Sequence, residues 1–211
     1  MSMTTAVGAI AGQADATVLL LMSSGAVKVW REDSVVTIIE PGEGERGAQV
    51  VCAAADPAGR VVLGLAAGGG RSGRISRLET DGKIVQLAEG AQAPAGFAFT
   101  PDGRGMYCAG WPRGAVSLFD YGQAAPSLGE ARPFAVFPES LGAPAGLAVD
   151  SRGFVWAGAR GGSCALRFSP EGREEQRLYF PAVLVSGLAL AGEDGRELWV
   201  TTAGGDDKKA N

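Results

Sequence analysis

The chain has 211 residues, of which 46% are hydrophobic and 20% are charged, and its formal net charge at pH 7 is −4. This composition is typical of a globular protein with a buried core, and the acidic balance without a basic stripe disfavours nucleic acid as a partner. The chain contains no histidine, which removes Ser-His and Cys-His catalytic pairs and most zinc and copper sites.

The N-terminal region lacks a basic segment, and its longest apolar run, Val18 to Met22, is too short for a signal core or a membrane span. We therefore expect a cytoplasmic protein that does not bind a membrane. The three cysteines are an odd number without a close pair, which indicates buried free thiols and not a disulfide framework or a Cys-x-x-Cys metal site. They are Cys52, Cys108 and Cys164.

A unit of roughly 40 to 50 residues recurs along the chain. Each copy begins with a small residue and a short strand that contains alanine, and it continues through a tight turn into a second apolar run. The copies begin at Gly8, Ala53, Gly96, Gly146 and Gly187.

The first four copies continue into a third and a fourth strand. In chain order, these strands are expected at residues 26–31 and 35–39, 74–78 and 84–87, 115–119 and 132–137, and 165–168 and 175–180. The fifth copy ends after its second strand. The polar residues 204–211 are expected to form a disordered charged tail.

Four short strands per unit are typical of a β-propeller blade, so the repeat predicts an all-β propeller of about four and a half blades, with residues 1–203 as one domain. A stacked solenoid is the alternative, although its repeats are usually shorter. The ring either closes with five blades or remains incomplete. Trp156, Trp199 and Tyr107 occupy matching places on second strands and are expected to fill the space between neighbouring blades.

Four segments carry a resemblance to a known family. They are Asp56-Pro57-Ala58-Gly59-Arg60, Phe99-Thr100-Pro101-Asp102-Gly103-Arg104 leading to Phe119-Asp120-Tyr121, Pro144-x-Gly-Leu-Ala-Val-Asp with Val155-Trp156-Ala157, and Glu197-Leu198-Trp199-Val200-Thr201-Thr202. Through them the chain resembles the senescence-marker-protein, gluconolactonase and regucalcin (luciferin-regenerating-enzyme-like) family over nearly all of residues 6–203. The resemblance implies a six-bladed lactonase type of propeller, here truncated, and a metal-dependent hydrolysis of sugar lactones or related esters.

The resemblance also implies a divalent cation such as calcium or zinc at the mouth of the propeller channel, held mainly by oxygen ligands that stand just before the first strands of the blades. Where the family has Asn-Asp-Gly, this chain has Val51-Cys52-Ala53. Ala95 replaces the asparagine of Pro-Asn-Gly, and Ala145 replaces the aspartate of Pro-Asp-Gly. Val7 and Ser186 stand at the same place in the first and fifth units, and only Ser186 retains an oxygen.

We therefore expect a degenerate, non-catalytic member without a metal or another cofactor, whose channel mouth binds a small organic molecule or a partner protein. The residues expected at this mouth are Val7, Val51, Cys52, Ala95, Ala145 and Ser186. The alternative is an active hydrolase of sugar lactones or related esters that uses other metal ligands or no metal. Because half a blade leaves exposed strand edges, homo-oligomerisation through these edges is a further expectation.

Other motifs have simpler interpretations. Gly68–Gly73 fits the spacing of a dinucleotide fingerprint, but a strand and not a helix is expected to follow it, which indicates a hairpin loop. Gly42–Glu45 is similar to the family's N-terminal glutamate motif but lies in a connection between units. The acidic residues of 171–175 are expected to be solvated, and Arg160 either faces solvent or pairs with an anionic ligand near the channel mouth.

Overall fold

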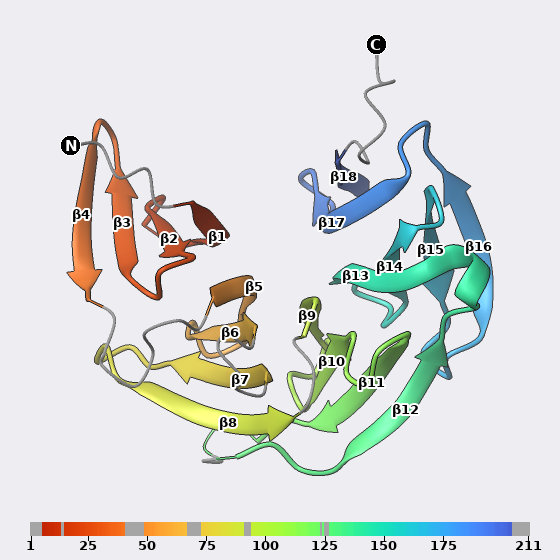
Figure 1. The fold of residues 1–211 in the computed structure, drawn as a ribbon, viewed down its shortest axis with the longest axis horizontal. Coiled ribbons are helices and arrows are strands. Elements are labelled where there is room, and N and C mark those ends of the chain that lie inside the picture. Colours follow the sequence, from red (N-terminus) through yellow and green to blue (C-terminus); the bar gives the residue numbers. More distant parts are fainter. Residues whose placement is uncertain are drawn as a thin grey trace. The chain divides into compact units, whose positions relative to one another are not determined.

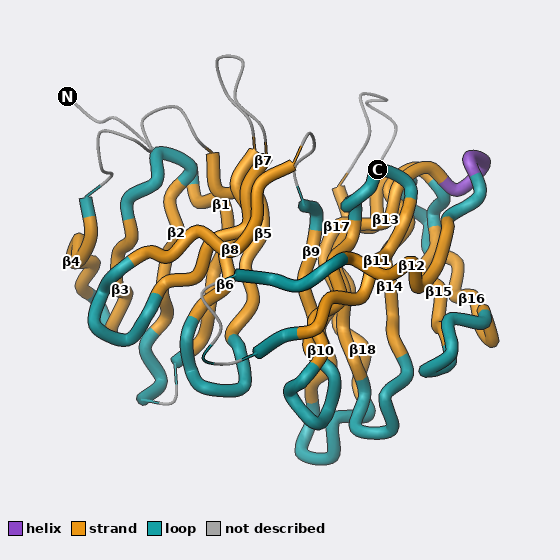
Figure 2. The backbone as a smooth tube through the Cα atoms, turned by 90° about the horizontal axis from the view of Figure 1, so that it is seen from below, coloured by secondary structure: helices purple, strands orange, loops and turns teal. Residues whose placement is uncertain are grey.

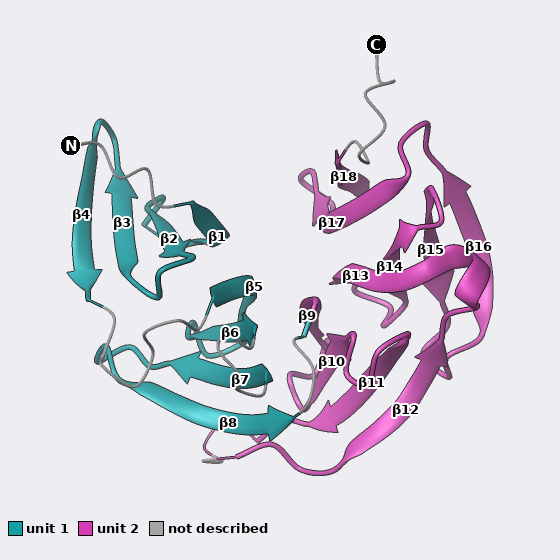
Figure 3. Cartoon of the chain, viewed as in Figure 1, with its two compact units in different colours: residues 1–94 teal, residues 95–211 magenta. Residues whose placement is uncertain are grey.

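The computed structural model describes residues 6–13, 15–40, 49–66, 73–90, 94–122, 124 and 127–203. The chain divides into two compact units, residues 1–94 and 95–211 (Figure 3). Within the described ranges the only helical element is a single 3-10 turn, η2 (Glu139–Leu141). No helix of these ranges is both long enough and apolar enough to cross a membrane.

Unit 1 consists of two four-stranded antiparallel sheets in which consecutive strands pair (Figure 1). The first contains β1 (Val7–Gly12), β2 (Val18–Met22), β3 (Val27–Arg31) and β4 (Ser34–Ile39), and the second contains β5 (Gln49–Ala55), β6 (Val61–Ala66), β7 (Gly73–Leu78) and β8 (Ile84–Gly90). The two sheets share one hydrophobic cluster, to which Leu21 and Val27 contribute from the first sheet and Val61 and Leu63 from the second.

Unit 2 begins with the same arrangement. One sheet contains β9 (Gly96–Phe99), β10 (Gly105–Ala109), β11 (Ala115–Asp120) and β12 (Ala131–Val136), and the next contains β13 (Gly142–Val149), β14 (Val155–Gly161), β15 (Cys164–Phe168) and β16 (Glu174–Tyr179). A hairpin of β17 (Leu184–Ala191) and β18 (Glu197–Ala203) joins the second sheet where Leu184 pairs with Arg160. Figure 2 shows the short turns that connect successive strands.

The repeat predicted from the sequence is confirmed in the described residues. Each of the first four copies is a four-stranded antiparallel sheet, hereafter a blade, and the fifth copy is the two-stranded hairpin β17–β18. The chain is therefore an all-β protein built from propeller blades, four complete and one half. That residues 1–203 form one domain remains a prediction, because two units are described, each by itself.

Turn chemistry explains where the strands break. Asp56 Oδ1 accepts hydrogen bonds from the amides of Ala58 (2.9 Å) and Arg60 (2.8 Å), which closes the turn between β5 and β6. Gly59 in this turn has a φ of +78°, a conformation that glycine adopts without strain. The turn between β13 and β14 has the same form, with Asp150 Oδ1 accepting from the amides that follow it.

One expectation about the aromatic residues is wrong. Trp156 and Tyr107 are buried, at 9% and 3% exposure, and they pack between blades as expected. Trp199 occupies the matching place on β18, opposite Ala189, but its exposure is 64%. The reason is that Trp199 points away from the packed side of the hairpin, and no described strand covers that side.

The remaining expectations about the chain have mixed outcomes. The three cysteines are buried and free, and the glutamates of 171–175 are exposed, as expected. The strand expected after the glycine run is β7, although residues 68–72 of that run lie outside the described residues. Gly42–Glu45 and the expected tail of residues 204–211 also lie outside them.

Candidate functional site

The inner strands of unit 2 meet backbone to backbone at a glycine of each strand. A Cβ atom on Gly96 would lie 2.8 Å from the carbonyl oxygen of Ala145, and a Cβ atom on Gly146 would lie 2.6 Å from the Cα atom of Gly187. Such distances leave no room for any side chain at these two glycines, so β9, β13 and β17 are in direct contact in this order. The residues that precede the three glycines are therefore neighbours: Ala95, Ala145 and Ser186.

The inner strands of unit 1 approach each other in the same way. A Cβ atom on Gly8 of β1 would lie 2.0 Å from the carbonyl oxygen of Val50 on β5. Beside this contact, the side chains of Val7 and Val51 are exposed, at 48% and 40%, whereas Cys52 is buried at 9%. The six residues expected at the channel mouth thus form two groups of three, one at the converging inner strands of each unit.

The group in unit 2 offers one oxygen. Ala145 is buried, with 4% exposure, and Ala95 packs against the core of the unit. The Ser186 hydroxyl donates a hydrogen bond to the carbonyl oxygen of Thr201 (3.2 Å) and lies 3.3 Å from the Thr201 hydroxyl. The only polar side chain of this group is therefore engaged with the neighbouring strand β18.

The group in unit 1 offers one sulfur. Cys52 Sγ donates a hydrogen bond to the carbonyl oxygen of Pro94 (3.6 Å). Burial raises the pKa of the Cys52 thiol far above its ordinary value, because a buried thiolate would lose its hydration. Since the thiolate is the reactive form of cysteine, the buried Cys52 thiol is a poor nucleophile in this structure.

These residues do not fit a divalent cation. Calcium requires six to eight oxygen ligands, and zinc is bound by thiolate, imidazole or carboxylate. The two groups supply one hydroxyl that is already hydrogen-bonded and one neutral thiol, together with the side chains of alanine and valine. Across the part of the chain that the structure describes, no cluster of three or more His, Cys, Asp or Glu side chains is able to hold an ion.

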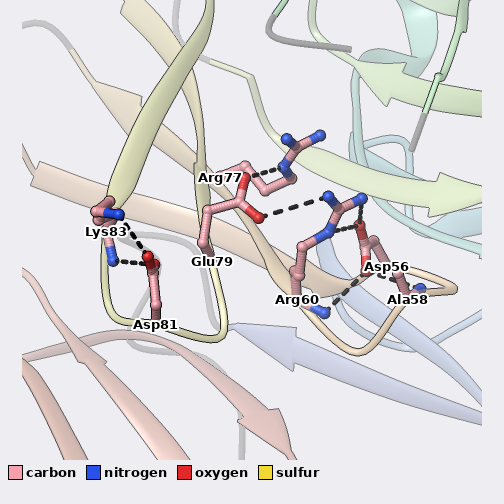
Figure 4. Close-up of polar contacts among 7 residues, drawn as sticks. All are labelled: Asp56, Ala58, Arg60, Arg77, Glu79, Asp81 and Lys83. Carbon is pink, nitrogen blue, oxygen red and sulfur yellow. Dashed lines mark hydrogen bonds and ion pairs between the residues drawn. The ribbon is translucent and has the colours of Figure 1, made fainter. Parts of the chain in front are cut away.

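A charged network in unit 1 lies outside the expected site (Figure 4). Arg60 Nη2 lies 2.6 Å from Asp56 Oδ2, and Arg60 Nη1 lies 3.5 Å from Glu79 Oε2. Arg77 Nε donates to the other oxygen of Glu79 at 2.6 Å. Both carboxylates are thus held by guanidinium groups, at the edge of a pocket of about 390 Å³ whose walls include Leu19. The sequence placed Asp56 and Arg60 in a turn but gave no sign of their partner on the next hairpin.

A second charged cluster lies between the last full blade and the hairpin in unit 2. Arg167 Nη2 donates to Asp150 Oδ2 at 2.9 Å, and its guanidinium lies 3.7 Å from the ring centroid of Phe154. Partial burial acts to raise the pKa of Asp150, but hydrogen bonds from Arg167 and from two turn amides outweigh it and hold this pKa below its ordinary value. Asp150 is therefore an ionised structural carboxylate.

Unit 2 contains a pocket of about 570 Å³ whose lining residues the sequence did not bring together. Its charged lining residues are Arg113 in the loop between β10 and β11, Glu139 in η2 and Arg160 at the end of β14. Of these, only Arg160 was considered in the sequence analysis, either as a residue that faces solvent or as one that pairs with an anionic ligand near the channel mouth. The other two could not be assigned to it, because their meeting depends on how two blades pack.

Comparison with known proteins identifies a family and several relatives. A family model described as "SMP-30/Gluconolactonase/LRE-like region" matches residues 1–204. The pentonolactonase XacC of Haloferax volcanii is 35% identical over 152 residues, which are 72% of this chain and 52% of that protein. An L-arabinolactonase of Azospirillum brasilense is 35% identical over 132 residues, 62% of this chain and 43% of that protein. The chain thus spans about half the length of these curated relatives.

Solved structures show the same fold at low sequence identity. Regucalcin from Agrobacterium tumefaciens superposes with a TM-score of 0.83 at 20% identity, over 96% of this chain and 70% of that one. The similarity to regucalcin concerns the fold alone, and it agrees with the blades described above.

Proposed function

Because the chain belongs to the SMP-30/gluconolactonase/LRE-like family, and because its residues do not fit the divalent cation that the family resemblance implies, we propose that it is a non-catalytic member that binds a small organic molecule. The observation that carries this proposal is the chemistry of three side chains, Cys52, Ala95 and Ala145, at the converging inner strands. The group in unit 1 thus supplies a neutral thiol and the group in unit 2 supplies two methyl groups, whereas a cation would need oxygen donors in either place.

Without a cation, the water that attacks a lactone carbonyl has no Lewis acid to lower its pKa. A metal-free reaction would instead need a general base or an activated nucleophile. The chain has no histidine, and Cys52 is a neutral thiol. The carboxylates of Asp56 and Asp150 are held by turn amides and by arginines. These features support a binding role over hydrolysis.

The apolar character of the site suggests what kind of molecule it accepts. Val7 and Val51 present exposed methyl groups beside the contact between β1 and β5. Ligand sites are mostly apolar, with a few polar groups that orient the ligand. The proposed ligand is therefore a small organic molecule that contacts these side chains, and a partner protein on the same surface is the other outcome.

The second candidate function is lactone hydrolysis. It is favoured by the names of two relatives, a pentonolactonase and an L-arabinolactonase, each 35% identical over the aligned residues. For this chain, hydrolysis would require cation ligands other than those at the inner strands, or none.

Lactone turnover separates the two functions. The purified chain is mixed with glucono-1,5-lactone or L-arabino-1,4-lactone, and proton release is followed with calcium, manganese or zinc present and again with a chelator. We expect the rate of spontaneous hydrolysis in every case, while the Haloferax pentonolactonase serves as the positive control. Turnover above the buffer rate would contradict the proposal, and its loss with chelator would assign the activity to a bound cation.

A further inference from the structure

The pocket of about 570 Å³ in unit 2 is lined by two arginines that come from different blades, Arg113 and Arg160. We propose that this pocket binds a small monocarboxylate that also carries hydroxyl groups. The pocket includes Gly142 and Ala143 of β13, but it uses none of the six residues at the contacts between the inner strands. It therefore does not depend on the proposed function.

The backbone of Arg160 is held on two sides. In the antiparallel register, Arg160 lies opposite Ala143 of β13 and opposite Leu184 of β17. On the β13 side the strands touch, because a Cβ atom on Gly142 would lie 2.1 Å from the carbonyl oxygen of Arg160. Gly142 has a φ of +72°, so both its conformation and its lack of a side chain are required there. The position from which the Arg160 side chain extends is therefore fixed before a ligand binds.

The loop that carries Arg113 is also closed by hydrogen bonds. The amide of Ala115 donates to the carbonyl oxygen of Pro112 (3.2 Å). The hydroxyl of Ser117 donates to the carbonyl oxygen of Trp111 (2.5 Å). The amide of Phe137 donates to the carbonyl oxygen of Gly114 (2.8 Å), which ties this loop to the residue that follows β12. Preorganised groups lose less freedom on binding and so contribute more to affinity.

Neither arginine has its charge neutralised by the protein. Within the described residues, Arg113 and Arg160 form no ion pair, whereas five other arginines of unit 2 are paired with carboxylates. These paired residues are Arg132, Arg167, Arg173, Arg177 and Arg196. Two guanidinium groups without partners at one pocket form an attractive site for an anion, because arginine donates two parallel hydrogen bonds to a carboxylate or a phosphate.

The other lining residues, Glu139 and Phe137, indicate which kind of anion the pocket accepts. Glu139 also lies at this pocket and forms no ion pair with a described residue, so the three charged side chains sum to about one positive charge. A singly charged anion matches this sum, and a phosphate dianion would be repelled by Glu139. The Glu139 carboxylate only accepts hydrogen bonds, so it selects a ligand with hydroxyl donors. Phe137, at 4% exposure, provides an apolar wall.

Binding of D-gluconate to the full chain tests the proposal. Equilibrium dialysis compares gluconate, D-glucitol, which has hydroxyl groups but no carboxylate, and inorganic phosphate. We expect saturable binding of gluconate, with no binding of glucitol and weaker binding of phosphate. Arg113→Gln and Arg160→Gln should each weaken gluconate binding by about tenfold or more, as the loss of a charged hydrogen-bond donor predicts.

Arg173→Gln is the matched control, because the Arg173 side chain is 81% exposed on a turn and does not line this pocket. Its affinity for gluconate should equal that of the unmodified chain. Glu139→Ala should reduce the preference for gluconate over acetate, which lacks hydroxyl groups. Thermal unfolding of each variant verifies that it is folded.

Three results would overturn the assignment. They are no saturable gluconate binding by the unmodified chain, equal affinity in the folded Arg113, Arg160 and Arg173 variants, and phosphate binding as tight as that of gluconate. Lactone turnover is measured separately, so failure of this proposal and failure of the proposed function are distinguishable.

Discussion

Asp56 and Asp150 occupy the same place in two blades, at the turn between the first and second strands. Each carboxylate accepts two hydrogen bonds from backbone amides of its own turn and one from an arginine side chain. The arginine is Arg60 for Asp56 and Arg167 for Asp150. A carboxylate with these partners stabilises the turn and has little remaining capacity to act as a base.

The acid stability of the chain should depend on Asp150. Its pKa is lowered in the folded state, so its ionised form stabilises the fold above its unfolded pKa of about 3.9, and this contribution is lost as the pH falls through the folded pKa. We expect Asp150→Asn to lower the free energy of unfolding at pH 7 by about 1–3 kcal/mol and to flatten its decline on the acid side. Denaturant unfolding at several pH values measures both effects.

Asp102→Asn is the control for this prediction. Hydrogen bonds from the Thr100 hydroxyl and from the amide of Arg104 also lower the pKa of Asp102, but this side chain is exposed and has no arginine within ion-pair distance among the described residues. Its replacement should cost less stability. Equal losses in the two variants would show that the arginine contributes nothing.

At the residue scale, the sequence predicts the turn aspartate of each interaction but not its arginine partner. The Asp-x-x-Gly pattern identifies the turn and its aspartate, because these residue types favour that local backbone. The partner Arg167 lies 17 residues after Asp150, on another strand, so only the register of β14 with β15 brings them together. The same holds for Arg113, Glu139 and Arg160, which meet through blade packing.

At the scale of the elements, contact between inner strands determines which residues are tolerated. A Cβ atom on Gly146 would lie 2.6 Å from Gly187 Cα, and both strands would have to move to admit it. We expect Gly146→Ala to lower the free energy of unfolding by about 1–3 kcal/mol, the usual cost of overpacking. Chemical denaturation provides the measurement.

Gly12→Ala is the comparison variant, because nothing lies within 4 Å of a Cβ atom at Gly12 and its φ is not positive. Its stability should remain within about 0.5 kcal/mol of the original chain. If Gly146→Ala were as stable as Gly12→Ala, the close approach of β13 and β17 would be incorrect.

The sequence predicts the elements well, and for a physical reason. Alternation of apolar residues and glycine-containing turns are local signals, so the strands of all five copies fall close to the predicted positions. The solvent exposure of a side chain, in contrast, depends on strands that are distant in the sequence. Trp156 and Trp199 occupy equivalent positions, but only Trp156 has a strand packed against its side of the sheet, so the pattern alone could not distinguish them.

At the scale of the whole molecule, two sheet faces carry exposed apolar side chains. On one face of β1–β4, Ile10, Trp30 and Val35 are 64%, 49% and 53% exposed, and the register places them on the same side of the sheet. On β17–β18 the exposed side carries Trp199. The first face also carries Lys28 and the second carries Glu197, two residues before the respective tryptophan.

We expect these two faces to bind each other between copies of the chain, head to tail, because both are apolar and their charges are opposite. Sedimentation velocity should show association that increases with concentration and that weakens in Trp30→Thr and Trp199→Thr. Tyr179→Thr, which alters an aromatic residue that is 69% exposed on β16, should have no effect. A monomer at all concentrations would contradict this prediction.

We propose that the inner strands do not supply the oxygen donors that a divalent cation needs. Thermal unfolding in calcium, manganese or zinc tests it most directly, because a site at a hundredfold excess of ion over its Kd would stabilise the fold by about 2.7 kcal/mol, which amounts to several degrees. We expect the same melting temperature with each ion and with a chelator. A rise with any one ion that the chelator reverses would contradict it.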